Sequence, residues 1–430
     1  MDSLQPLGHA AHLAALLAAI LLLARVGRGL ARRLRQPGVI GEIVVGLLAG
    51  PAVLHLFGRD TFDAVLPGSA LDALKVVTEA GLVLFLVGLA HELRAASGTE
   101  RRATAWVAAG SLVPPLCAGA LLAGYVLLAD DPVVRGSAPT AAFVLMVAVT
   151  MSITAVPVMA RILADRGMNN TSAGRLALSA AVAIDAVGWL LCMLAISLGA
   201  GSATGFLRSL LGIAAGAAGA LAVRYGLRVT AVRKACARRP RTATAVLGAT
   251  ALAVASAVEH LGMTAILGAA LVGLAIPTGD GTPWSPMVAT LTRTGRALVP
   301  AFFVVTGVTV LNQAFSRLSW TLVVTALVLA CAGKGIGGYL GARLGGQPPA
   351  ASRRIAVLMN ARGLTELIML QAGLAAGILT APLVLALTVM AVATTAVTGP
   401  LLGLLDRGAG EVEPPTPNPP VAVAAEGGIR

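Results

Sequence analysis

The stretch SAAVAIDAVGWLLCMLAIS, from Ser179 to Ser197, holds a single charged residue, Asp185. A carboxylate at the centre of a lipid bilayer costs roughly 2.5–3.5 kcal/mol on insertion scales. An acidic residue in such a stretch therefore faces protein or water and marks a functional site. A carboxylate in that position can bind a cation or a proton. The sequence thus predicts a functional site at Asp185.

Lys334 is a second ionisable residue within an apolar stretch. Counted from the inner end of its predicted span, Asp185 is nine residues in and Lys334 eight or nine, so both are expected about 12–14 Å from the inner membrane edge. Lysine can lose its proton when buried, whereas arginine effectively cannot, and only three lysines occur beside 29 arginines. We predict Lys334 as the charge partner of Asp185; a purely structural salt bridge is the alternative.

Two apolar stretches contain residues that interrupt a helix. In TMSITAVPVMARILADRG, Pro157 removes a backbone hydrogen bond, and Ser152 and Thr154 offer oxygen ligands for an ion. In LMNARGLTELIML, the interrupting residues are Asn360, Arg362, Gly363 and Glu366. Broken helices at mid-depth are tolerated where they line a cavity. Both stretches are predicted discontinuous helices; the Arg362–Glu366 pair, one turn apart, could instead support the break structurally.

Two further acidic residues are embedded in apolar stretches. Glu42 lies near the inner end of its stretch and could extend toward the membrane edge, with a structural and a functional role both open. Glu79 lies near an outer end, where a structural or surface role is expected.

The elements that must position these residues are membrane-spanning helices. Of the 430 residues, 57% are hydrophobic and 12% charged, against about 25% charged in soluble domains. Continuous apolar runs of about 20 residues recur, which fits helical spans rather than a barrel. We predict an all-α polytopic membrane protein of about 13 spans, and not an enzyme. The predicted spans are 7–24, 38–57, 72–91, 103–128, 138–160, 176–199, 205–223, 242–259, 262–278, 298–315, 319–342, 355–376 and 382–405.

The two interrupted spans are the fifth and the twelfth, so they cross the membrane in opposite directions. Paired interruptions in oppositely directed halves indicate an inverted-repeat transporter, with its site at mid-membrane between half-helix ends. Asp185 is the predicted charged group of that site.

The basic residues fall mainly on one side of the predicted spans. With the N-terminus outside, 24 lysines and arginines lie on the inner side and five on the outer side. The positive-inside rule then predicts an outside N-terminus and a cytoplasmic C-terminus. The net charge of +13 is therefore a topology signal, with contact to anionic lipid as a further role, and not a nucleic-acid surface. The Pro-rich tail at 406–430 is predicted to be disordered.

Small residues repeat along the eleventh span. The glycines at every fourth position are Gly333, Gly337, Gly341 and Gly345. Such a face permits close helix packing, here expected in the core rather than at a dimer contact. The cysteines, at 117, 192, 236 and 331, form no paired motif. No disulfide, metal or cofactor is predicted.

Taken in order, the motifs resemble the monovalent cation:proton antiporter-2 family, in its sodium/hydrogen exchanger, potassium-efflux-type branch without the nucleotide-binding domain. The resemblance covers nearly all of residues 7–405. Its carriers are QPGVIGEIVVGLLAGP, AGLVLFLVGLAHEL, SITAVPVMARILADRG, ALSAAVAIDAVGW, LGMTAILGAALVGLAIP, ALVPAFFVVTGV, GKGIGGYLGARL and MNARGLTELIML.

The resemblance implies a multi-pass homodimer in the cell membrane, with an antiporter domain over residues 1–405. Its spans would divide into a dimer scaffold at about 7–91 and 242–315, a mobile core at about 103–199 and 319–405, and a linking span at about 205–223.

The resemblance also implies roles for three of the residues above. The two discontinuous helices would cross near Asp185, which falls at the family's ion- and proton-binding aspartate. Lys334 falls at the family's basic position, and Thr154 in the unwound segment of the fifth span.

One position departs from the family's pattern. Members commonly carry Asp-Asp, Asn-Asp or Gln-Asp here, whereas this chain has Ile184 before Asp185. An isoleucine cannot ligate a cation, pair with Lys334 or carry a proton. A single site acid predicts one-for-one, electroneutral exchange, unless Lys334 also cycles its proton.

The predicted function is exchange of Na⁺ or K⁺ for H⁺ by alternating access, with no nucleotide or nucleic acid as partner. One alternative is a proton-coupled carrier of another solute, such as an organic or ionophore-complexed cation, which the apolar Ile184 would suit. The other is a degenerate, non-transporting membrane scaffold or sensor.

Overall fold

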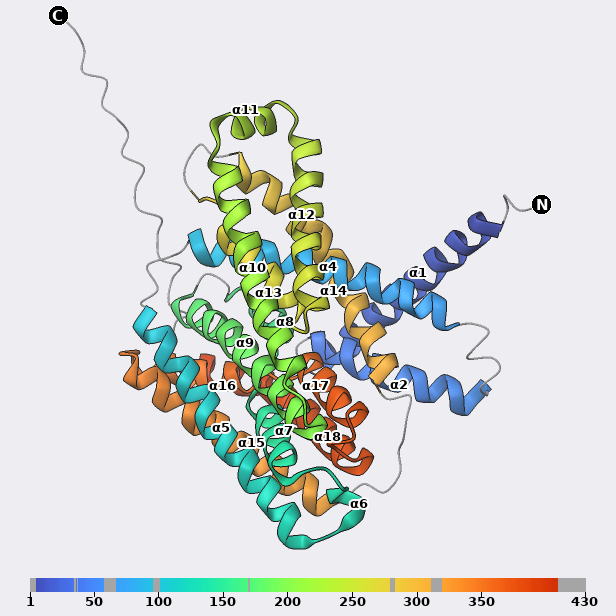
Figure 1. The fold of residues 1–430 in the computed structure, drawn as a ribbon, viewed down its shortest axis with the longest axis vertical. Helices are drawn as coiled ribbons and strands as arrows, with labels where there is room; N and C mark the ends of the chain where they lie inside the picture. Colours follow the sequence, from blue (N-terminus) through green and yellow to red (C-terminus); the bar gives the residue numbers. More distant parts are fainter. Residues whose placement is uncertain are drawn as a thin grey trace, which may run out of the picture.

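The apolar runs fold as helices in a computed structural model, which describes residues 5–34, 36, 38–57, 67–95, 101–168, 171–278, 283–310 and 319–408 (Figure 1). All regular secondary structure in these ranges is helical. The predicted disordered tail lies outside the described residues from position 409 on. The helices are α1 (Gln5–Arg33), α2 (Gly38–Phe57), α4 (Gly68–Ala95), α5 (Arg101–Ala129), α6 (Pro132–Arg135), α7 (Thr140–Ser152), α8 (Val156–Asp165), α9 (Ser172–Ala200), α10 (Thr204–Arg228), α11 (Thr230–Arg238), α12 (Pro240–His260), α13 (Ala265–Ala275), α14 (Trp284–Val310), α15 (Trp320–Leu344), α16 (Pro349–Met359), α17 (Leu364–Ala375) and α18 (Ala381–Gly408).

Ten stretches of the described residues are long and apolar enough to cross a bilayer, against the 13 spans expected from the sequence. Two of the predicted spans are not among these ten because their helices are too short: α13, and the pair α16 and α17, which an interruption divides. Helix α13 has 11 residues, which is about 16 Å of helix, or half the thickness of a bilayer core.

Some predicted boundaries are wrong. Helix α14 begins at Trp284, well before the span expected at 298–315. Its first turns contain Arg293 and Arg296, whose polarity lowers the hydropathy of a segment that is nevertheless helical. The short helices α6 and α11 were not expected, because they lie in connections where no apolar run indicates them.

The helices pack in two groups. Helices α1, α2, α4, α12, α13 and α14 pack on one another, and α5, α7, α9, α15, α16 and α18 form the second group. Helix α10 contacts α12 and α13 of the first group and α9 of the second, while α8 and α17 touch both groups. In Figure 1, α5 and α15 of the second group run side by side at the lower left.

The glycine repeat of α15 is the surface on which α5 packs. A Cβ at Gly341 would lie 2.5 Å from the Trp106 carbonyl oxygen, and one at Gly337 would collide with the Gly110 carbonyl. Only glycine therefore lets the two backbones approach this closely. The repeat makes a contact within the chain, as expected.

The fifth and twelfth predicted spans are each divided into two helices. Residues 153–155 separate α7 from α8, and residues 360–363 separate α16 from α17. The two breaks lie against each other, because the Ala155 N–H donates to the Ala361 carbonyl over 3.1 Å. The Thr154 hydroxyl donates to the Met359 carbonyl over 3.1 Å.

Local chemistry explains where each break falls. Pro157 lies in the first turn of α8, where its missing N–H costs no helical hydrogen bond. Gly363 precedes α17 with φ of 156°, a conformation that residues with side chains rarely adopt, and a Cβ there would lie 2.7 Å from Val158 Cγ2.

Candidate ion site

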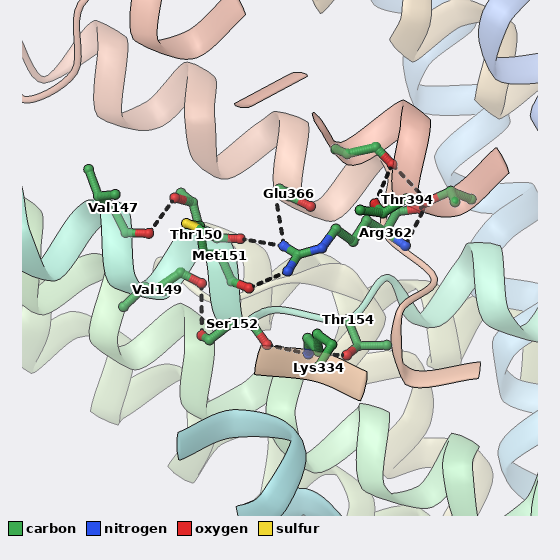
Figure 2. Close-up of polar contacts among 12 residues, drawn as sticks. Val147, Val149, Thr150, Met151, Ser152, Thr154, Lys334, Arg362, Glu366 and Thr394 are labelled. Carbon is green, nitrogen blue, oxygen red and sulfur yellow. Dashed lines mark hydrogen bonds and ion pairs between the residues drawn. The ribbon is translucent and has the colours of Figure 1, made fainter. Parts of the chain in front are cut away.

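Two buried basic side chains satisfy the carboxyl end of α7. Arg362 donates from Nη1 to the Thr150 carbonyl at 3.3 Å and from Nη2 to the Met151 carbonyl at 2.5 Å. Lys334 Nζ donates to the Ser152 carbonyl at 2.5 Å (Figure 2). The last carbonyls of a helix lack intrahelical partners and attract cations. These two basic groups therefore stabilise the interrupted end of α7.

Lys334 has three oxygen acceptors and no exposure to the surface. Besides the Ser152 carbonyl, its Nζ lies 3.0 Å from the Ser111 carbonyl and 2.6 Å from Thr154 Oγ1. The Ser111 carbonyl is free because its usual helical partner, four residues on, is Pro115, which has no N–H. Three acceptors match the three donors of an ammonium group.

Ser152 and Thr154 therefore contact Lys334 and form no hydrogen bond to Asp185. Ser152 uses its carbonyl for Lys334, and its hydroxyl donates to the Val149 carbonyl over 2.8 Å. The Thr154 hydroxyl accepts from Lys334 and donates to Met359. The oxygens expected to ligate a free ion hold a tethered ammonium group in this structure.

Asp185 forms no hydrogen bond or ion pair with that cluster. It is 1% exposed, and its Oδ2 accepts from Thr264 Oγ1 over 3.3 Å. Its other carboxylate oxygen, Oδ1, has no hydrogen-bond partner among the described residues. Asp185 and Lys334 do not form an ion pair in this conformation, because no nitrogen–oxygen distance between them falls within 4.0 Å. Their predicted equal depth in the membrane permitted such a pair.

Thr264 is a site residue that the sequence reasoning missed. It is the N-cap of α13, where its side chain accepts from the Leu267 N–H at 3.3 Å while it donates to Asp185. Asp185 thus lies beside the positive end of a helix. Because α13 and α9 belong to different packing groups, the contact joins the two groups. The available signal was a threonine directly before an apolar run, which is typical of an N-cap.

Arg362 and Glu366 pair with each other, in the manner that the sequence left open. Their side chains are fully buried, with Arg362 Nη1 3.2 Å from Glu366 Oε1 (Figure 2). The Arg362 N–H also donates to Thr395 Oγ1 over 2.8 Å. These contacts hold the α16–α17 break against α7 and α18.

Asn360 is the remaining polar residue of that break. It caps the carboxyl end of α16, and its Nδ2 lies 3.8 Å from Cys331 Sγ. Its Oδ1 is buried without a hydrogen-bond partner among the described residues.

The other two embedded acids differ in environment. Glu42 is fully buried, and its Oε1 lies 2.6 Å from Arg28 Nη2 and 3.9 Å from Arg161 Nη2. Arg161 is in α8, so Glu42 of α2 links the first packing group to the broken helix. Glu79 is partly exposed and lies 4.0 Å from Lys75, which fits the structural or surface role expected for it.

The helices follow the fold of a solved polytopic membrane antiporter. The structure superposes on that of MjNhaP1, a sodium proton antiporter from Methanocaldococcus jannaschii, with a TM-score of 0.58 over 92% of this chain and 98% of that one, at 14% sequence identity. The family model described as "Sodium/hydrogen exchanger, transmembrane" matches residues 18–405, and the chain belongs to this family.

Two relatives give the same assignment by sequence. The chain is 34% identical over 412 residues to Cation/H(+) antiporter 17 of Arabidopsis thaliana, which covers 92% of this chain and 49% of that protein. It is 31% identical over 401 residues to the Na(+)/H(+) antiporter NhaS4 of Synechocystis, covering 89% of this chain and 94% of the relative. The chain spans about half the length of the plant relatives it matches.

Proposed function

We propose that this protein exchanges a monovalent cation, Na⁺ or K⁺, for H⁺ across the cell membrane. The observation that carries the proposal is Asp185, a buried carboxylate with one oxygen free of any partner among the described residues, at a contact between two helix groups. Cation and proton would compete for this one group. Competition for a single site couples the two flows in opposite directions.

Alternating access would follow from movement between the two groups. We assign α1, α2, α4, α12, α13 and α14 to a dimer scaffold, and the remaining spans, apart from the linking α10, to a mobile core with two crossing discontinuous helices. The packing of the helices and the contact between the two breaks support this division. Thr264 would stay with the scaffold while Asp185 travels with the core, so their hydrogen bond would form in one orientation and break in the other.

The surroundings of Asp185 favour one-for-one, electroneutral exchange. Ile184 is buried and offers no ligand. Lys334 is held by three oxygens of its own, and Glu366 is paired with Arg362. Of these buried acids, Asp185 is the one without a basic partner among the described residues, and it would take either the cation or the proton.

Cation exchange is favoured over the two alternatives drawn from the sequence. The relatives reported above are named as cation/proton antiporters, which argues against an organic-cation carrier and against a non-transporting scaffold. We further propose 13 spans, a homodimer and an outside N-terminus, on the strength of the charge bias and the resemblance described above.

The test is transport in everted membrane vesicles with a fluorescent pH indicator. Added Na⁺ or K⁺ should release the quenching of the indicator with the unaltered protein, and Asp185→Asn should abolish this response. Glu79→Gln is the matched control: it removes another acid of the apolar stretches, one that is partly exposed, and should leave exchange intact. Exchange that survives Asp185→Asn would overturn the proposal.

A further inference from the structure

An apolar cavity lies beneath the short helix α11. The cavity has a volume of about 380 Å³ and is formed by α11, the carboxyl end of α10, the first turns of α12 and Trp284 at the start of α14. In Figure 1, α11 connects the tops of α10 and α12. Val232 and Val246 line the cavity and are 36% and 60% exposed, so it opens to the surroundings of the protein.

Helix α11 contacts α10 and α12 and turns its apolar side to the cavity between them. Val232, Ala235, Cys236 and Arg239 line it, at the spacing that puts residues on one side of a helix. Among the described side chains that line the cavity, Arg239 is the one charged residue, and it stands at the end of α11. The mainly apolar lining offers few partners for ordered water, so a hydrocarbon chain suits this cavity better than water does.

The rim of the cavity is strongly basic. Within residues 229–242 the charged residues are Arg233, Lys234, Arg238, Arg239 and Arg241, and none is acidic. All five are exposed. None of them forms an ion pair with a carboxylate of the described residues. A basic cluster beside an apolar cavity of a membrane protein attracts anionic lipid headgroups, by roughly fivefold per basic residue near the membrane surface.

We propose that this cavity is a binding site for an anionic phospholipid. One acyl chain occupies the space between α10, α11 and α12, and the phosphate group lies at Arg239 with its basic neighbours. A zwitterionic lipid would fill the same cavity without neutralising the cluster, so the site selects by headgroup. The site is independent of the ion site at Asp185.

Trp284 provides a direct reading of occupancy. A variant that keeps only this tryptophan (Trp106→Phe, Trp189→Phe and Trp320→Phe) is reconstituted into mixed phosphatidylglycerol and phosphatidylcholine vesicles. Bromine, which quenches tryptophan fluorescence, is placed on the acyl chains of one lipid or of the other, at the same overall composition. We expect quenching to report at least about fivefold enrichment of phosphatidylglycerol at Trp284, corresponding to one basic residue's attraction.

Neutralising the rim should remove this preference. Arg238→Gln with Arg239→Gln and Arg241→Gln is expected to give equal quenching from both lipids, whereas Arg32→Gln with Arg33→Gln, at the end of α1, should leave the preference unchanged. In the chain with all its tryptophans, phosphatidylglycerol should raise the unfolding temperature above that in phosphatidylcholine, and the rim variant should lose this increment. Equal quenching by the two lipids in the rim-intact protein, or no headgroup effect on unfolding, would overturn the proposal.

Discussion

Replacing Thr264 with valine removes the hydrogen bond to Asp185 while keeping the shape of the side chain. Hydrogen bonds to charged groups contribute about 1.5–3 kcal/mol, and the distance of 3.3 Å is long enough to favour the lower end of that range. A loss of about 1.5 kcal/mol corresponds to an affinity change of about tenfold. We expect Thr264→Val to raise the apparent KM for the transported cation about tenfold at fixed pH, because the anionic carboxylate loses its donor and protons compete better for the site.

The assay is cation-dependent proton movement in proteoliposomes, measured over a range of Na⁺ or K⁺ concentrations. Thr264→Val also removes the cap of α13, which costs about 1 kcal/mol of stability. Two controls separate the effects. Thr264→Ser keeps the hydroxyl and should behave like the unaltered protein, and Thr171→Val removes a comparable cap, of α9, without touching Asp185. An unchanged KM in Thr264→Val, or an equal rise in Thr171→Val, would refute the reasoning.

Three further substitutions test the packing around the helix breaks. Gly363→Ala should lower the free energy of unfolding by about 1–3 kcal/mol, and with it the unfolding temperature, because alanine rarely adopts this backbone conformation and its Cβ would collide with Val158. Gly335→Ala is the control: a Cβ at that position meets nothing within 4 Å, so this change should be neutral or stabilising. Lys334→Met should destabilise the protein by at least about 1–3 kcal/mol in denaturation, since three buried acceptors lose their donor. Arg362→Met should lower the free energy of unfolding by about 3–5 kcal/mol, because it leaves Glu366 buried and unpaired. Adding Glu366→Leu should recover part of that loss. A double variant less stable than Arg362→Met alone would contradict this account.

Much of the architecture follows from local features of the sequence. The apolar runs identify the helical spans, and Pro157 and Gly363 mark the two interruptions, because each acts on the backbone of its own segment. The close packing of α15 on α5 follows from its glycine repeat in the same way. Such features require no knowledge of which helices are neighbours.

The partners of Asp185 and Lys334 were not predictable in this way. Thr264 is 79 residues from Asp185 in sequence, and Ser111 is 223 residues from Lys334. Equal depth in the membrane cannot show on which side of a helix group each residue lies. Pro114 and Pro115 within α5 were the signal for free helix carbonyls, but only the tertiary structure brings Lys334 to one of them.

The central claim is that one carboxylate, Asp185, takes either a proton or a cation. Proton release from the purified protein on cation binding tests this most directly, with a pH indicator in weakly buffered solution near neutral pH. Adding the cation identified by the vesicle assay should release protons up to one per chain from the unaltered protein, and Asp185→Asn should release none. Undiminished release from Asp185→Asn, or saturating cation binding by the unaltered protein without proton release at any pH tested, would contradict the account.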